Sequence, residues 1–214
     1  RFIVDMAVTC DRCKALVRFD HDRSWARVCT CGSLVGHDGR RAVEYEADMP
    51  VLNDLTPFRI GHVGRFEGKE FRVTGRIRVE GANGYRNFWS LHGPDLPFQW
   101  LMNAYGNFAL LATWDRPFPK DRMKGIKPTR QVKTDERDGY IAELMDNSFK
   151  FAWEGELMRP FMLPYTIEME AGRAPSHKLI VHVKASTDIE ALEGRMVEFA
   201  ELCFEHATEL AGWR

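Results

Sequence analysis

The sequence lacks any hydrophobic run long enough to cross a membrane. A spanning helix needs about 18 or more consecutive apolar residues, and no such run occurs among the 214 residues. The first residues, Arg1 to Met6, are too few and too polar for a secretory signal peptide. With 44% hydrophobic and 29% charged residues the composition is that of an ordinary globular protein. We expect one large or two small domains.

Sequence signatures of common enzymes are also missing. The seven histidines are scattered, and neither a His-Glu-x-x-His nor a Gly-x-Ser-x-Gly motif occurs. The glycines at 61, 64 and 68 precede no expected helix, so they fit strand turns rather than a phosphate cradle. The sequence therefore predicts no catalytic residues and no enzyme activity.

One pair of carboxylates could be an exception to this expectation. Glu154 and Glu156 alternate along an expected strand, where a pair on one face could perform acid–base chemistry. No second polar cluster accompanies them, so a solvated strand edge is the preferred interpretation. His62 and His92 belong to the same unit and could meet in space.

Cysteine is scarce, but four of the five cysteines lie close together. Cys10 and Cys13 form a Cys-x-x-Cys pair, and Cys29 and Cys31 follow after fifteen residues. Such clustering favours a metal over a disulfide framework, and hence a reducing compartment. We expect the four thiolates to hold one structural Zn²⁺ ion with no open position for a reacting water. Cys203, far away, is expected to be a small buried apolar residue.

The second cysteine pair is tighter than the usual knuckle, because one residue separates Cys29 from Cys31 and Gly32 must provide the turn. Two alternatives stay open. Either His21 or His37 replaces Cys29 as a ligand, or the four cysteines bind no metal and are buried or redox-active. A ribbon of about 25 residues is too small to be stable by burial alone, so the ion would supply folding free energy on the order of 10 kcal/mol.

Alternation of apolar and polar residues predicts a mainly β chain. Ala15–Phe19 and Ser24–Val28 are expected to be the strands of the zinc ribbon, joined by the turn Asp20–Arg23. Further strands are expected at 58–64, 65–73, 75–80, 85–92, 98–102, 108–114, 140–145, 149–153, 165–170 and 178–184. Turns are expected at 67–69, 81–84 and 103–107.

The alternation of apolar and polar residues changes phase between the expected strands 65–73 and 75–80. Phe71, Val73, Ile77 and Val79 are expected on one face, and Arg72, Arg76 and Arg78 on the other, with a bulge at Thr74-Gly75. Short strands with regular glycine turns indicate a small, strongly bent sheet or barrel.

The C-terminal segment is expected to be a helix. Thr187 to Glu190 fits a capping box. Apolar and neutral residues recur at helical spacing, opposite a glutamate-rich side; they are Ile189, Leu192, Met196, Phe199, Cys203, His206 and Leu210. This stripe is expected to face the core.

The expected fold class is therefore α+β, mainly β. Residues 1–50 form the zinc ribbon and a linker, and residues 58–114 form the first part of the β domain. Residues 115–139, rich in proline and charge, form a loop. Residues 140–214 complete the second domain with strands and the amphipathic helix.

Charge is divided unevenly along the chain. Residues 1–134 contain 22 Lys+Arg and 15 Asp+Glu, whereas residues 135–214 contain 8 and 16. Attraction between the halves, head-to-tail self-association, or an ordinary solvated surface would each be consistent with this asymmetry.

A family resemblance is carried by several segments. They are the run Ile60–Val79, Trp89-Ser-Leu, Phe98-Gln-Trp-Leu101, Tyr105-Gly-Asn and Gly155-Glu-Leu157. Together, over roughly residues 10–165, they resemble the bacterial domain-of-unknown-function family forty-one seventy-eight, in which a zinc knuckle commonly precedes the glycine-rich strands. The resemblance implies a mostly β fold and no known activity. It also implies a cytoplasmic accessory protein from membrane-stress and polyamine-related gene clusters.

Two functions follow as hypotheses. The first is a non-enzymatic interaction or adaptor protein, whose sheet presents Trp89, Trp100 and Trp114 to another protein, including a membrane-associated one. For two of these three tryptophans, burial in the core is the alternative. The second is nucleic-acid binding by the basic first two-thirds of the chain. Its surface would be lined by Arg72, Arg76, Arg78 and Arg86.

Overall fold

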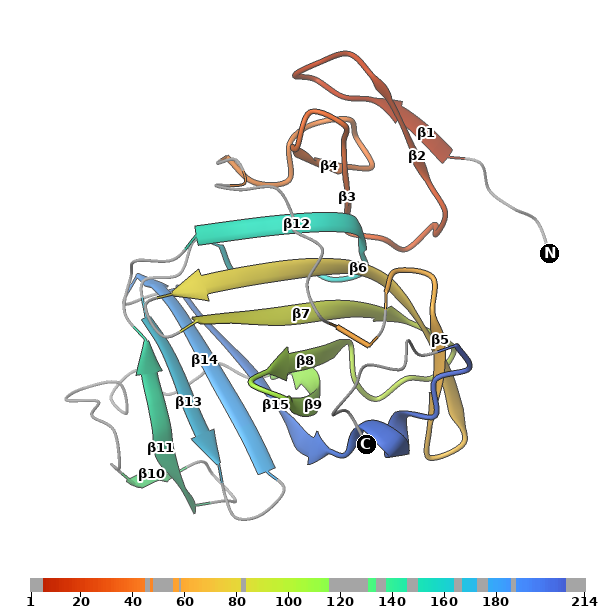
Figure 1. Ribbon diagram of the computed structural model, residues 1–214. Helices are drawn as coiled ribbons and strands as arrows, with labels where there is room; N and C mark the ends of the chain where they lie inside the picture. Colours follow the sequence, from red (N-terminus) through yellow and green to blue (C-terminus); the bar gives the residue numbers. More distant parts are fainter. Residues whose placement is uncertain are drawn as a thin grey trace.

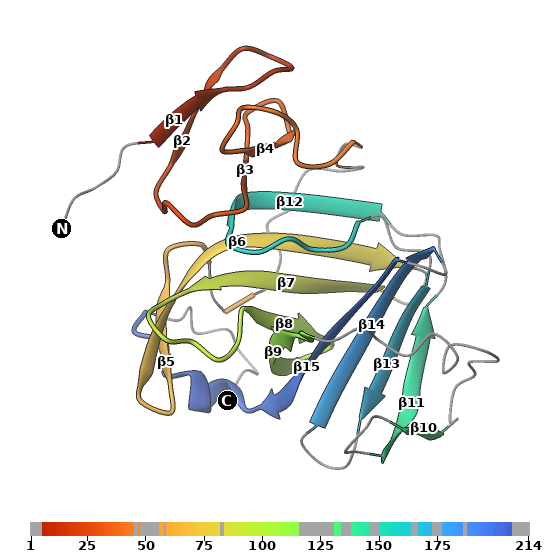
Figure 2. The same ribbon diagram turned by 180° about the vertical axis from the view of Figure 1, so that it is seen from behind.

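The computed structural model shows a protein built almost entirely from antiparallel β-strands (Figures 1 and 2). It describes residues 6–44, 47, 56–57, 59–81, 84–115, 131–133, 138–145, 150–163, 167–172, 177–185 and 188–206. Within these residues the sequence prediction of a mainly β fold is confirmed.

Fifteen strands are present in the described chain. They are β1 (Met6–Thr9), β2 (Leu16–Phe19), β3 (Ala26–Val28), β4 (Leu34–Gly36), β5 (Val63–Phe66), β6 (Lys69–Gly81), β7 (Gly84–His92), β8 (Trp100–Ala104), β9 (Asn107–Thr113), β10 (Gln131–Lys133), β11 (Asp138–Met145), β12 (Lys150–Leu157), β13 (Ile167–Gly172), β14 (His177–Ala185) and β15 (Asp188–Val197).

Strands β1 and β2 pair only with each other, and the remaining strands share one large sheet. Its order is β10-β11-β13-β14-β15-β9-β8-β7-β6-β12-β3-β4, with β5 pairing to β6. The sheet bends sharply, so that β13 and β14 run steeply across the direction of β6, β7 and β12 (Figure 1). The described strands do not close into a barrel, because β10 and β4 end the path.

The expected turns fall where the sequence places them. Phe66 pairs with Lys69 across Glu67-Gly68, and Ala104 pairs with Asn107 across Tyr105-Gly106. Both residues of each turn have positive φ, the conformation that two-residue hairpins of this twist require.

The expected bulge is confirmed, and it has a consequence for the core. The pairing of β6 with β7 shifts register between Val73 and Gly75. One extra residue reverses the faces, so Phe71 and Val73 belong to one buried cluster while Ile77 and Val79 belong to another. The expectation that these four side chains share a face is therefore wrong.

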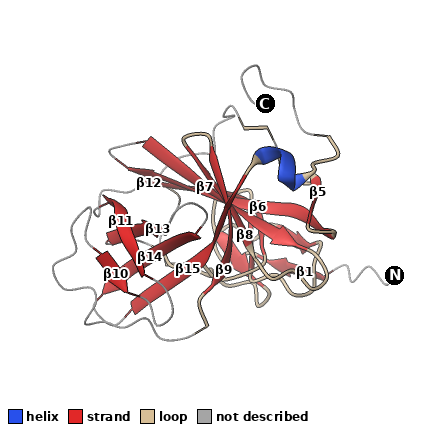
Figure 3. Ribbon diagram, turned by 90° about the horizontal axis from the view of Figure 1, so that it is seen from below, coloured by secondary structure: helices blue, strands red, loops and turns tan. Residues whose placement is uncertain are grey.

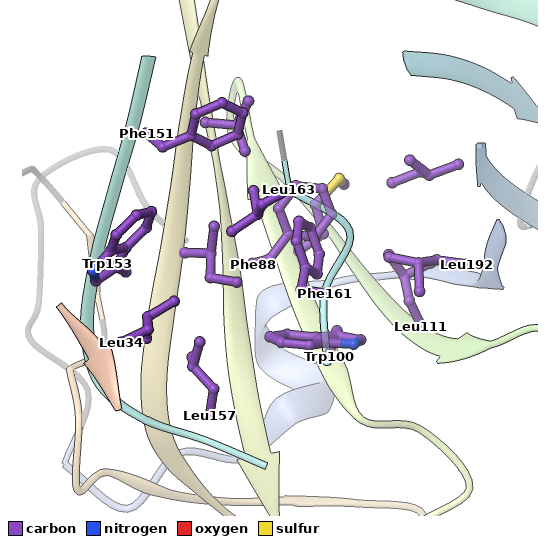
Figure 4. Packing of buried hydrophobic residues seen from close by; sticks show 14 of the residues in the cluster. Leu34, Phe88, Trp100, Leu111, Phe151, Trp153, Leu157, Phe161, Leu163 and Leu192 are labelled. Atoms are coloured by element: carbon purple, nitrogen blue, oxygen red, sulfur yellow. The ribbon is translucent and has the colours of Figure 1, made fainter. Parts of the chain in front are cut away.

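Two apolar clusters cover the two sides of the central strands. The larger contains Phe88, Trp100 and Phe161 (Figure 4). The ring centroid of Phe161 lies 4.9 Å from that of Phe88 and 5.0 Å from that of Trp100. The second contains Phe71, Trp89 and further apolar side chains. Strands buried on both sides are held mainly by burial of apolar surface.

The tryptophans follow the core alternative for two of the three, whereas the arginines are placed differently from expectation. Trp89 and Trp100 are buried, so they are core residues rather than presented to a partner. Arg76, Arg78 and Arg86 are also buried. Arg76 packs over the Trp89 ring at 4.5 Å, and Arg78 packs over a neighbouring tyrosine at 3.7 Å. The expected arginine-lined surface is therefore wrong, since of the four arginines only Arg72 is exposed.

The expected C-terminal helix is also wrong over most of its length. Asp188–Val197 is strand β15, which pairs with β14 on one side and β9 on the other. Gly194 allows close approach to β9, because a Cβ there would collide with the Leu110 backbone. The flanking strands satisfy the backbone of β15, and this tertiary pairing overrides the helical spacing of its apolar residues.

Only a short 3-10 helix, η2 (Phe199–Leu202), follows β15 and lies beside β5 (Figure 3). Leu210 of the expected helix lies outside the described residues. Among the described residues no helix has both the length and the apolar character needed to cross a bilayer.

Candidate metal centre

The four clustered cysteines occupy the turns of two neighbouring hairpins. Cys10 and Cys13 lie between β1 and β2, and Cys29 and Cys31 lie between β3 and β4. The expected strands are present, but β2 and β3 do not pair with each other. β2 pairs with β1, and β3 pairs with β4 and β12. Each hairpin thus presents one cysteine pair.

Backbone hydrogen bonds shape both turns. In the first, the Cys10 amide donates to the Ala15 carbonyl at 2.9 Å, and the Lys14 amide donates to the Cys10 carbonyl at 3.0 Å. In the second, the Cys29 amide donates to the Ser33 carbonyl at 2.9 Å, and the Gly32 amide donates to the Cys29 carbonyl at 2.8 Å. Gly32 has a φ of 85°, so the tight turn uses the glycine as expected.

The sulfur atoms have the spacing of a tetrahedral ligand set. Cys10 Sγ lies 3.9 Å from Cys31 Sγ, and Cys13 Sγ lies 3.5 Å from Cys29 Sγ. All four sulfurs lie within 4.8 Å of one another. A tetrahedral ion with metal–sulfur bonds of about 2.3 Å separates its ligands by about 3.8 Å. The arrangement therefore fits one metal ion shared by both hairpins.

The thiols differ in environment. Cys10 and Cys29 are buried, whereas Cys13 is exposed and Cys31 half-buried. Burial acts to raise the pKa of Cys31, but hydrogen bonds with Ser33 and contacts with neighbouring thiols lower it to about 6. A hydrogen bond from the Ala15 backbone acts to lower the pKa of Cys13, but contacts with the other thiols raise it to about 11. A bound cation would favour the thiolate form of all four cysteines, so the thiols would no longer share the remaining protons.

Arg12 adds a positive charge beside the cluster. Its guanidinium donates to the Cys31 carbonyl at 3.1 Å and lies 3.5 Å from Ser33 Oγ. Four thiolates and one divalent ion leave a net charge of −2, which a neighbouring arginine partly offsets.

The histidine alternatives are used elsewhere. The ring of His37 packs on Phe19 at 4.3 Å, and His21 Nδ1 lies 3.4 Å from Glu156 Oε2. All four sulfurs, Cys29 included, belong to the cluster. Cys203 is exposed in a left-handed conformation after η2, so its expected burial is wrong.

Glu156, expected at a solvated edge, is instead a buried carboxylate. Its side chain is 3% exposed. It accepts hydrogen bonds from the backbone amides of Asp20 and His21, both at 3.1 Å, from the Ser24 hydroxyl, and from Arg27 at 3.2 Å. We call these residues the Glu156 clasp: Asp20, His21, Ser24, Arg27 and Glu156.

The two glutamates do not form a catalytic pair. Gly155 has a φ of 74° and breaks the alternation between them. A Cβ at position 155 would lie 2.5 Å from the Thr74 carbonyl oxygen, so β6 and β12 can approach here only with glycine. Glu154 turns instead to Arg76, 2.9 Å away.

The clasp is not a nucleophile relay either, although it contains a serine, a histidine and a carboxylate. In such a relay the histidine lies between the other two, whereas here the carboxylate contacts both Ser24 and His21. Burial acts to raise the pKa of Glu156, but hydrogen bonds from His21, Ser24 and the Asp20 amide lower it. A carboxylate held ionised by donors is a weak base and a strong structural acceptor.

His92 packs against His21, whereas His62 packs against Phe204. The rings of His92 and His21 lie 4.3 Å apart between centroids. Burial, followed by the charges of His21 and of Arg72, lowers the pKa of His92. The end of β7 thus contacts the segment that joins the two cysteine pairs.

Comparison of the chain with protein-family models, curated proteins and solved structures finds no match. The resemblance to the domain-of-unknown-function family stays a prediction.

Proposed function

We propose that the four cysteines bind one structural Zn²⁺ ion and that the chain is a non-enzymatic adaptor. Its N-terminal module, residues 6–44, would be folded by the ion and would contact another protein. The observation that carries the metal assignment is the approach of four sulfur atoms from two hairpins to within 4.8 Å. Thiolate sets of this kind favour zinc or iron, and a set of four leaves no position for a reacting water.

The small core of the module supports a structural role for the ion. Apart from two of the cysteines, its buried cluster contains only Val17, Phe19 and Val35. So little apolar surface does not offset the loss of conformational entropy in the β1–β2 hairpin. Strands β3 and β4 are also part of the large sheet, and they bury Ala26 and Leu34 in its larger cluster. Metal binding would supply the missing free energy.

The β1–β2 hairpin supports the interaction role. Among the described strands it pairs with no other element, and it projects beyond the large sheet (Figure 1). Leu16 is one of the few large apolar side chains exposed in the described chain. An exposed hairpin edge offers backbone groups to which a partner strand can add.

The first experiment is elemental analysis of protein purified without affinity metals. We expect one zinc per chain in the wild type and none in Cys10→Ser or Cys31→Ser. Absence of metal from the wild type, or iron in its place, would contradict the zinc assignment.

The adaptor role needs a separate experiment. Proteins that co-purify from the native host would be compared between wild type and Cys10→Ser, with Cys203→Ser as the matched control. A partner retained by wild type and control but lost from Cys10→Ser is expected. A partner set unaffected by Cys10→Ser would argue against contact through the module.

A further inference from the structure

The Glu156 clasp acts on the segment that separates the two cysteine pairs. Residues 14–28 join Cys13 to Cys29, and the clasp fixes four points of that segment from β12, more than 120 positions away in sequence. The path in space of the segment between the two pairs is thus fixed by contacts with the large sheet.

The second hairpin has its own attachments to β12. The Trp25 amide donates to the Leu157 carbonyl at 2.8 Å, and Trp153 Nε1 donates to the Gly32 carbonyl at 2.7 Å. These bonds hold the Cys29–Cys31 turn against the sheet independently of Glu156.

The first hairpin is attached differently. The Asp11 amide donates to the Gly39 carbonyl at 3.0 Å, a bond within the module. The carboxylate of Glu156 receives the amides of Asp20 and His21, directly after β2 ends. The clasp therefore determines where the end of β2 meets the large sheet, and with it where Cys10 and Cys13 stand relative to the second pair.

We propose that Glu156 is a positioning residue that couples metal affinity of the cysteine cluster to docking of the module on β12. This inference rests on the proposed metal site. With the segment fixed, the four sulfurs are already arranged for the ion, and less conformational freedom is lost on binding. By linkage the ion must strengthen the clasp by the same factor with which the clasp strengthens ion binding.

The ionised carboxylate suits this role because it accepts from several donors at once. Two backbone amides, one hydroxyl and one guanidinium converge on its two oxygens. Loss of such an acceptor leaves buried donors unsatisfied, which costs more than the bonds themselves contribute.

The test is chelator competition for zinc in Glu156→Gln, with Glu154→Gln as matched control on the same strand. The amide of glutamine keeps the shape but cannot accept at both ends. We expect zinc affinity to fall about tenfold or more in Glu156→Gln, within the usual range of coupling between sites, and to stay unchanged in Glu154→Gln. The Co²⁺-substituted spectrum should keep the signature of four thiolates in both variants, because the ligands themselves are unaltered.

Hydrogen exchange in the wild type gives a reading independent of any variant. The amides of Asp20 and His21 should exchange more slowly with zinc than without it, while amides of β7 change little. Equal zinc affinity of Glu156→Gln and wild type, together with metal-independent exchange of these amides, would overturn the coupling but leave the zinc site standing. A wild type without bound metal would overturn both.

Discussion

The N-terminal module and the central strands are stabilised in opposite ways. Strands β6 to β9 lie between two apolar clusters, with Phe88, Trp100 and Trp89 fully buried. The β1–β2 hairpin buries only a few apolar side chains beside the four cysteines. It meets β3, β4 and the rest of the large sheet through the cysteine cluster and the Glu156 clasp. Burial stabilises the sheet without specific chemistry, whereas the module depends on a few polar and metal contacts.

The largest expected effect is on the module alone. Cys29→Ser should abolish stoichiometric zinc and remove folding free energy on the order of 10 kcal/mol from the module. Limited proteolysis should then cut within residues 6–44 while the rest of the chain stays resistant. Cys203→Ser is the control and should behave as wild type. Full protection of residues 6–44 in Cys29→Ser would show that the module does not need the ion.

The converse perturbation acts on the sheet. Trp100→Ala leaves a cavity in the larger cluster and should lower the free energy of unfolding by about 3–5 kcal/mol. Denaturant titration followed by circular dichroism would measure it. We expect zinc stoichiometry to be retained under native conditions. A variant as stable as wild type would mean that the cluster is not packed as described.

A smaller effect is expected within the clasp. Ser24→Ala removes one donor to Glu156 and should cost about 1–2 kcal/mol. It should act with Glu156→Gln non-additively, since both changes break the same contact. A double-mutant cycle measures this, and strict additivity would contradict the direct contact.

Acidification is expected to weaken the clasp gradually. The pKa of Glu156 lies below its ordinary value of 4.5, so its contribution to stability is present above that pH and is lost as the pH falls through the folded-state pKa.

A second effect of pH comes from His92. Its pKa lies below 6.5, so the unfolded chain binds the proton first and stability declines as the pH falls below 6.5. His92→Gln should flatten the stability profile as the pH falls below about 6.5. An unchanged slope in His92→Gln would contradict this assignment.

Local features were predictable from the sequence. The hairpin turns Glu67-Gly68 and Tyr105-Gly106, the bulge after Val73 and the clustering of Cys10 to Cys31 each depend on residues close together in the chain. Their conformation follows from glycine placement, alternation and ligand spacing.

Long-range features were not predictable. Glu156 and Ser24 are 132 positions apart, and nothing in the sequence near either residue specifies the other. Arg76 and Arg78 alternate like a solvated face but are covered by the fold. Residues Asp188–Val197 have apolar residues at helical spacing, and only their pairing with β9 and β14 makes them a strand. Glu154 and Glu156 both lie between Trp153 and Leu157 in an otherwise apolar strand, and nothing local to the strand marks which of the two is buried.

X-ray absorption at the zinc edge tests the central claim most directly. For metal-loaded wild type we predict four sulfur neighbours at about 2.3 Å and no nitrogen or oxygen in the first shell. A shell containing histidine nitrogen or water oxygen, or the absence of zinc from correctly folded protein, would contradict the four-cysteine centre.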